Sequence, residues 1–146
     1  MTDLMQLGQQ AKDSAQQLAL MPTNRKNELL VQMAKTIKKN QQAIIEANHK
    51  DLEKAVENNI SETMQDRLQL TPERINAMVA EIEKIASLDD PIGKVDEMWT
   101  NTDGLRIGKK RVPLGVIGII YESRPNVTTD AASLAFKSGN AVILRG

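Results

Sequence analysis

One turn of the sequence gathers polar and charged side chains, the stretch Glu122-Ser123-Arg124-Pro125-Asn126. It follows an apolar run, Val112 to Tyr121, and precedes a segment with helical spacing, so it lies where a strand gives way to a helix. The amide of Asn126 can donate a hydrogen bond beside the unpaired backbone N–H groups of a helix start. Donors grouped in this way can stabilise negative charge that develops on a carbonyl oxygen.

Each of these side chains also has a purely structural interpretation. Asn126 could act only as the helix N-cap, which spacing alone favours. Arg124 could form a forked pair with a carboxylate or phosphate ligand, or could instead bind Glu122 or a neighbouring loop. Arg145 ends the next apolar run, Ala141 to Leu144, where a ligand contact and a solvated strand end are both compatible with the sequence. The residue types leave these alternatives open.

A strand–helix–strand unit positions the turn. The two apolar runs, Val112 to Tyr121 and Ala141 to Leu144, predict strands, and the segment between them predicts a crossover helix. Gly139 suits a left-handed helix terminus, and Asn140 suits a tight turn into the second strand. Ligands of open parallel sheets bind at the carboxyl ends of the strands, which is where the polar turn falls.

Helices are predicted throughout residues 1–91, because apolar residues recur there at spacings of three and four. The predicted segments are Thr2 to Leu20, Thr23 to Lys39, a short helix from Asn40 through Ala47, Leu52 to Val56, Ser61 to Arg67, and a long helix from Thr71-Pro72 to Asp89-Asp90-Pro91. Thr2, Asn48 and Thr71 are the predicted N-caps of the segments that they precede.

A hairpin is predicted over Val95 to Arg111, within residues 92–112. Apolar and polar residues alternate loosely around Asn101-Thr102-Asp103-Gly104, which is typical of a multi-residue hairpin turn. An isolated hairpin is marginal in water. This arm is therefore expected to pack against another part of a longer chain or against another subunit.

Composition excludes several classes of function. The 146 residues carry 19 basic and 19 acidic side chains, one histidine, no cysteine and 2% aromatic residues, so neither a nucleic-acid surface nor a metal site is expected. Neither a signal peptide nor a membrane-spanning run is present, which favours a cytoplasmic protein without membrane contact. The usual Rossmann fingerprint and the Walker loop are also absent, since Gly115 and Gly118 lie upstream of the turn.

The stretch YESRPNVTTDAASLAFKSGNAVILRG, with RVPLGVIGII before it, resembles the gamma-glutamyl phosphate reductase family (glutamate-5-semialdehyde dehydrogenases) of the aldehyde dehydrogenase superfamily. IIEANHKDLEKA, DRLQLTPERI and IASLDDPIGKV agree with the same family in the same order, so the resemblance covers nearly the whole chain. It implies an incomplete α/β fold like that of aldehyde dehydrogenases. Residues 1–91 would be the helical part of the NADP-binding domain, 92–112 an oligomerisation hairpin, and 113–146 the start of the Rossmann-like sheet.

The resemblance implies the NADPH-dependent reduction of L-glutamyl 5-phosphate to L-glutamate 5-semialdehyde and phosphate, a step of proline biosynthesis. A cysteine thiolate would displace the phosphate to give a thioester that NADPH then reduces. Asn126 matches the oxyanion asparagine, and Arg145 matches a basic residue that contacts the ribose and its phosphate. Arg124 is a weaker match for a substrate contact. Ile120, Tyr121, Glu122 and Ser123 match the segment beside the cofactor.

The absence of cysteine is a departure from the family, whose nucleophile would lie beyond Gly146. The sequence is therefore expected to be an amino-terminal fragment that is inactive by itself. The family's oligomerisation strands make a homo-oligomer through the hairpin arm the expected assembly. The alternative is a non-catalytic helical and hairpin module that binds a partner subunit.

Overall fold

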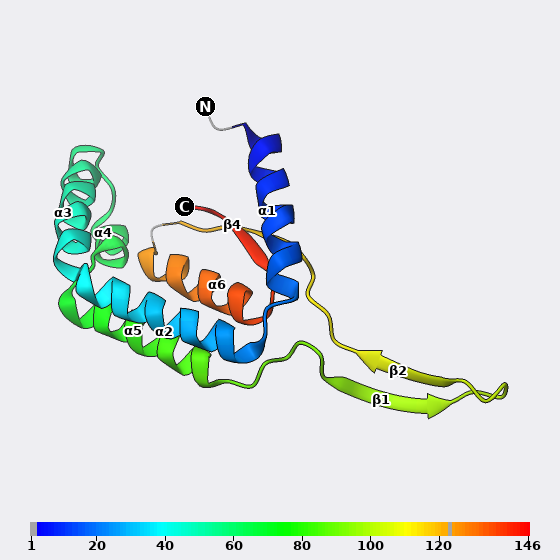
Figure 1. The fold of residues 1–146 in the computed structure, drawn as a ribbon. Helices are drawn as coiled ribbons and strands as arrows, with labels where there is room; N and C mark the ends of the chain where they lie inside the picture. The colour runs from blue at the N-terminus through cyan, green and yellow to red at the C-terminus, as the bar shows by residue number, and fades with distance from the viewer. Residues whose placement is uncertain (1–2, 123) are drawn as a thin grey trace.

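Five helices precede a hairpin, which in turn precedes a strand–helix–strand unit (Figure 1). The structure, a computed structural model, describes residues 3–122 and 124–146. Its elements are α1 (Leu4–Ala19), α2 (Thr23–Lys39), α3 (Gln41–Glu57), α4 (Glu62–Leu68), α5 (Pro72–Ser87), β1 (Val95–Thr100), β2 (Arg106–Lys110), β3 (Val116–Ile120), α6 (Pro125–Lys137) and β4 (Ala141–Arg145). The expected helical region, hairpin and incomplete parallel sheet are thus present.

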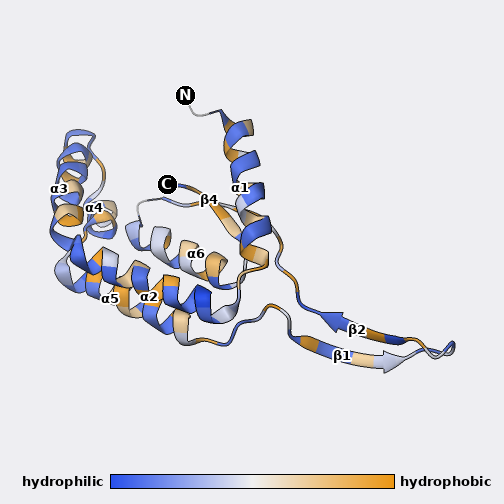
Figure 2. Ribbon diagram, viewed as in Figure 1, coloured by the Kyte–Doolittle hydropathy of each residue, from blue (hydrophilic) through white to orange (hydrophobic). Residues whose placement is uncertain are grey.

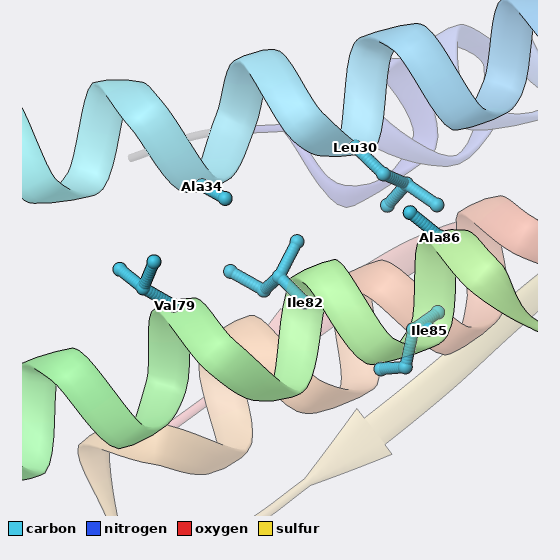
Figure 3. Packing of buried hydrophobic residues seen from close by; sticks show 6 residues of the cluster. All are labelled: Leu30, Ala34, Val79, Ile82, Ile85 and Ala86. Atoms are coloured by element: carbon cyan, nitrogen blue, oxygen red, sulfur yellow. The ribbon is translucent and has the colours of Figure 1, made fainter.

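The core forms where α2 and α5 pack together. Leu30 and Ala34 of α2 face Val79, Ile82 and Ala86 of α5 (Figure 3), and all five side chains are buried. These residues recur at spacings of three and four, so each helix presents one apolar stripe to the other. α6 packs against both helices, with Phe136 against the same cluster. The body that carries the polar turn is therefore held by helix–helix packing.

The prediction of a helix break around Asn48 is wrong. α3 runs without interruption from Gln41 to Glu57, and Asn48 is buried in its middle. Its Nδ2 donates to the carbonyl of Leu68 at 2.9 Å, and its Oδ1 accepts the N–H of Leu70 at 2.7 Å. These tertiary hydrogen bonds satisfy backbone groups at the end of α4 and just after it, so the side chain joins two segments where the sequence suggested a local cap.

The other capping predictions have separate outcomes. Thr71 is confirmed as the cap of α5, because its side chain accepts the N–H of Arg74 at 3.2 Å. Thr2 lies outside the described residues. α1 instead begins after Asp3, whose carboxylate accepts the N–H of Met5 at 3.0 Å.

The hairpin extends away from the helices as an arm (Figure 1). β1 and β2 pair antiparallel, with Trp99 opposite Ile107, and every residue of both strands is exposed. At its base Arg111 Nε donates to both carboxylate oxygens of Asp96, at 3.0 and 2.9 Å, and this hydrogen bonding holds the pKa of Asp96 below its ordinary value. Apolar residues lie along the arm among polar ones (Figure 2), and the rest of the described chain leaves them exposed.

β3 and β4 form the expected parallel pair, joined by α6 as the crossover. β3 is shorter than the apolar run that predicted it, because Pro113 lacks an N–H for the ladder and Gly115 has a φ of 112°. The N–H of Gly115 donates to Asn140 Oδ1 at 2.9 Å, and the carbonyl of Gly115 accepts the N–H of Ala141 at 2.9 Å. Asn140 thereby sets the start of the strand pair.

Gly139 is confirmed as the left-handed residue that ends α6, with a φ of 73°. A Cβ at this position would lie 2.9 Å from Pro113 Cγ. We expect Gly139→Ala to lower the free energy of unfolding by about 2 kcal/mol, through backbone strain and this clash. Urea denaturation measures the change.

Gly8 provides the matched control, because it lies inside α1 and a Cβ there would have no neighbour within 4 Å. Gly8→Ala is expected to raise the free energy of unfolding by roughly 0.5–1 kcal/mol. Equal shifts for the two variants would contradict the conformational role assigned to Gly139.

Candidate functional site

The carboxyl ends of β3 and β4 bring Ile120 and Arg145 side by side, as Cα partners in the parallel register. Both side chains are exposed, Ile120 to 86%. The N–H of Tyr121 donates to the carbonyl of Arg145 at 3.0 Å and extends the pairing by one residue. These strand ends present an apolar side chain and a cation at the same edge, where parallel sheets bind ligands.

Tyr121 connects the strand ends to α6. Its hydroxyl lies 2.5 Å from Thr128 Oγ1, and its ring packs against Gly146, where an added Cβ would be 3.0 Å from the ring atom Cε2. The first turn of α6 is therefore fixed relative to the sheet edge. Glu122 is exposed next to it, and Ser123 lies outside the described residues.

Asn126 is the second residue of α6, after Pro125. The N-cap is Arg124, so the interpretation of Asn126 as a cap is wrong: the proline occupies the first helical position, where its missing N–H costs nothing. The Asn126 amide donates to Asp130 Oδ2 at 3.1 Å, one helical turn along. Its second amide hydrogen has no acceptor among the described residues.

A cleft of about 560 Å³ lies between the start of α6 and the corner joining α4 to α5. Arg124, Asn126 and Asp130 line it from α6. Opposite them, Arg74 Nη2 forms an ion pair with Asp66 Oδ1 at 3.0 Å. The residues at the strand ends are not part of this lining. The predicted site residues therefore fall into two groups: Arg124 and Asn126 at the cleft, and Ile120 to Glu122 with Arg145 at the sheet edge.

The structure differs from the sequence-based expectations at Arg124, at Asp130 and in the cleft itself. Among the described residues Arg124 forms no ion pair, so its alternative pairing with Glu122 is not found there. Asp130 was missed, although its spacing of four from Asn126 is the spacing at which helical side chains meet. The cleft was also missed, because its two walls are far apart in sequence.

Residues 3–122 and 124–146 contain neither a metal-binding cluster nor a membrane-spanning helix. No three His, Cys, Asp or Glu residues in these ranges are arranged to hold a metal ion. None of the helices there is both long enough and apolar enough to cross a membrane.

Comparison with curated proteins gives relatives over nearly the whole chain, while no family model matches it. It is 66% identical over 145 residues to a gamma-glutamyl phosphate reductase of Enterococcus faecalis, covering 99% of this chain and 35% of that protein. It is 52% identical over 139 residues to one of Moorella thermoacetica, covering 95% of this chain and 33% of that protein. The chain thus spans about a third of the length of the curated relatives it matches.

Comparison with solved structures also gives gamma-glutamyl phosphate reductases. The crystal structure of gamma-glutamyl phosphate reductase from Thermotoga maritima superposes with a TM-score of 0.94 at 42% identity, covering 98% of this chain and 34% of that one. The crystal structure of gamma-glutamyl phosphate reductase from Saccharomyces cerevisiae superposes with a TM-score of 0.94 at 33% identity, covering 100% of this chain and 37% of that one. By sequence and by fold, this chain matches about a third of a gamma-glutamyl phosphate reductase.

Proposed function

We propose that this chain is the amino-terminal part of a cytoplasmic, NADPH-dependent reductase of proline biosynthesis. The reductase converts L-glutamyl 5-phosphate to L-glutamate 5-semialdehyde and phosphate. The observation that carries the proposal is the placement of Asn126, which lines a cleft and has one amide N–H without an acceptor among the described residues. The likeness to gamma-glutamyl phosphate reductases supports the choice of substrate.

In this mechanism Asn126 stabilises the oxyanion. A cysteine thiolate from outside these 146 residues attacks the acyl carbon, and negative charge develops on the carbonyl oxygen before phosphate leaves. The Asn126 amide and the start of α6 supply hydrogen-bond donors for that charge. The bond to Asp130 restricts rotation of the amide, so the donor is oriented before the substrate binds.

The sheet edge fits part of a nicotinamide dinucleotide. Arg145 provides a cation suited to a phosphate, and the exposed Ile120 beside it provides an apolar surface suited to a ring. We assign Ile120, Tyr121, Glu122, Ser123 and Arg145 to this cofactor contact. NADPH, when bound, supplies the hydride.

Enzyme assay tests the proposal. The purified full-length reductase carrying these residues should consume NADPH when supplied with freshly generated glutamyl phosphate, whereas the 146-residue chain, which has no cysteine, should not. Turnover by the short chain, or none by the full-length protein, would contradict the proposal. In the second case the non-catalytic, partner-binding module becomes the preferred function.

We also propose that the hairpin packs against a second copy of the protein. The exposed Met98, Trp99 and Ile107 support this assignment, because apolar surface on a projecting arm gains from burial. We expect Ile107→Asp to shift the full-length protein toward the monomer in analytical ultracentrifugation.

Leu4→Asp is the matched control for the hairpin variant, since Leu4 is 79% exposed but lies on α1. It should leave the mass distribution unchanged. An unchanged distribution for Ile107→Asp would remove the hairpin from the assembly interface.

A further inference from the structure

The cleft beside Asn126 carries charges of both signs. Its charged lining consists of Arg67, Arg74, Arg124, Asp66, Glu81 and Asp130. Three positive and three negative side chains therefore face a single space next to the oxyanion position. This balance is unlike that of an anion site, which would be dominated by cations and N–H donors.

Some of these charged groups already form hydrogen bonds or ion pairs within the protein, and others do not. Arg74 is held by Asp66 and by the carbonyl of Gln69 at 2.8 Å, and Asp130 accepts the Asn126 amide. By contrast, Arg67 and Arg124 have no side-chain hydrogen bond or ion pair to any other described residue. These two guanidinium groups are available to a ligand.

Glu81 is an acidic residue of α5 that also lines the cleft. Its only ion pair within the described ranges is with Lys84, at 3.6 Å between two well-exposed side chains, which is a weak interaction. The apolar members of the lining, Leu70, Ala77, Met78 and Pro125, offer contact to methylene groups.

We infer that this cleft binds the α-amino-acid end of the acyl phosphate. Arg124 and Arg67 receive the α-carboxylate, Glu81 receives the α-ammonium, and the apolar lining contacts the two methylene groups that lead to the acyl carbon at Asn126. The inference rests on the proposed function, because it places the reacting carbon at that asparagine. It goes further by assigning the recognition of a zwitterionic head group to named residues.

The phosphate of the same substrate is the competing ligand for Arg124. Glu81 and Asp130 line the cleft together with the arginines, and both carboxylates would repel a phosphate dianion. A zwitterion instead presents a positive group to the acids and a negative group to the arginines. The mixed lining therefore favours the head group over the phosphate.

Steady-state kinetics of the full-length reductase, run in the reverse direction, distinguishes the two ligands. In that direction L-glutamate 5-semialdehyde, phosphate and NADP⁺ give the acyl phosphate, NADPH and a proton, so each substrate has its own KM. Arg124→Ala is expected to raise the KM for the semialdehyde by about 10- to 100-fold, through loss of charge-assisted hydrogen bonds. The KM for phosphate should stay within about twofold, and Glu81→Gln should behave in the same way.

Arg25→Ala is the control, because Arg25 is an exposed arginine on α2 outside the cleft and is paired with Glu28 at 3.1 Å. It should change neither KM. A rise in the phosphate KM for Arg124→Ala, or no rise in either, would overturn the inference while leaving the proposed function intact. A full-length protein without any reductase activity would overturn the proposed function and this inference with it.

Discussion

Asn126→Ala is expected to slow thioester formation in the full-length reductase by roughly 100-fold or more. Asn126 lines the cleft, and its amide contact with Asp130 at 3.1 Å orients it without using its second N–H. Alanine keeps the helix but removes this donor, so the developing oxyanion loses a hydrogen bond that alanine cannot replace. Rapid-mixing measurement of phosphate release in a single turnover reports this step directly.

Two further variants separate an oxyanion donor from a structural residue. Asn126→Asp has nearly the same shape but carries an acceptor and a negative charge, so it should be at least as slow as Asn126→Ala. Asn58→Ala removes an exposed amide at the C-cap of α3, bonded to the carbonyl of Lys54 at 2.8 Å, and should leave the rate unchanged. Because Asn126 is exposed and does not cap α6, its alanine variant should unfold within about 0.5 kcal/mol of the wild type. An unchanged rate of phosphate release would exclude the oxyanion role.

The sequence predicted those parts of the fold that depend on local pattern. The apolar spacing predicted the long helix α5, which buries six residues, and Thr71 with Pro72 marked its start. Asn48 could not be interpreted in this way, because a cap and a tertiary hydrogen bond use the same amide. Only the packing of α3 beside the chain after α4 decides between them.

In the site, too, the part set by local pattern could be predicted and the part set by packing could not. The parallel strands placed Arg145 beside Ile120 at the sheet edge, as the alternation of strand and helix implied. The cleft could not be predicted, because it requires the α4–α5 corner to meet the start of α6, about fifty residues later in the chain. Which charged side chains share it is determined by helix packing and leaves no local signal.

Removal of the Asp90 carboxylate is the substitution with the largest expected effect on stability. Lys26 is only 2% exposed; its ammonium pairs with Asp90 and donates to the carbonyl of Lys137 at 3.1 Å. Asp90 also accepts hydrogen bonds from Thr23 Oγ1 at 2.8 Å and from the N–H of Ile92 at 2.9 Å. Asp90→Ala leaves a buried charge without its counter-ion, so we expect the free energy of unfolding to fall by about 3–5 kcal/mol.

The controls for Asp90→Ala are a substitution of the neighbouring carboxylate and a double variant. Asp89 is 89% exposed and pairs with Lys94 at 3.1 Å, so Asp89→Ala should change the free energy of unfolding by less than about 0.5 kcal/mol. Combining Lys26→Met with Asp90→Ala should recover part of the loss, because the unpaired charge is then absent. Equal urea midpoints for Asp89→Ala and Asp90→Ala would show that the buried pair adds no stability.

The effect of Asp90 on stability should also depend on pH. Burial raises the pKa of Asp90, but hydrogen bonds from Lys26, from the N–H of Ile92 and from Thr23 outweigh this and hold the pKa below its ordinary value of 3.8. A carboxyl whose pKa is lower in the folded state stabilises the fold fully above its unfolded pKa and loses that contribution as pH falls through the folded pKa. Wild type and Asp90→Ala should therefore differ by a constant amount near neutral pH, and the difference should shrink below about pH 4. A gap that stayed constant on acidification would mean that the carboxylate charge is not what holds Lys26 in the core.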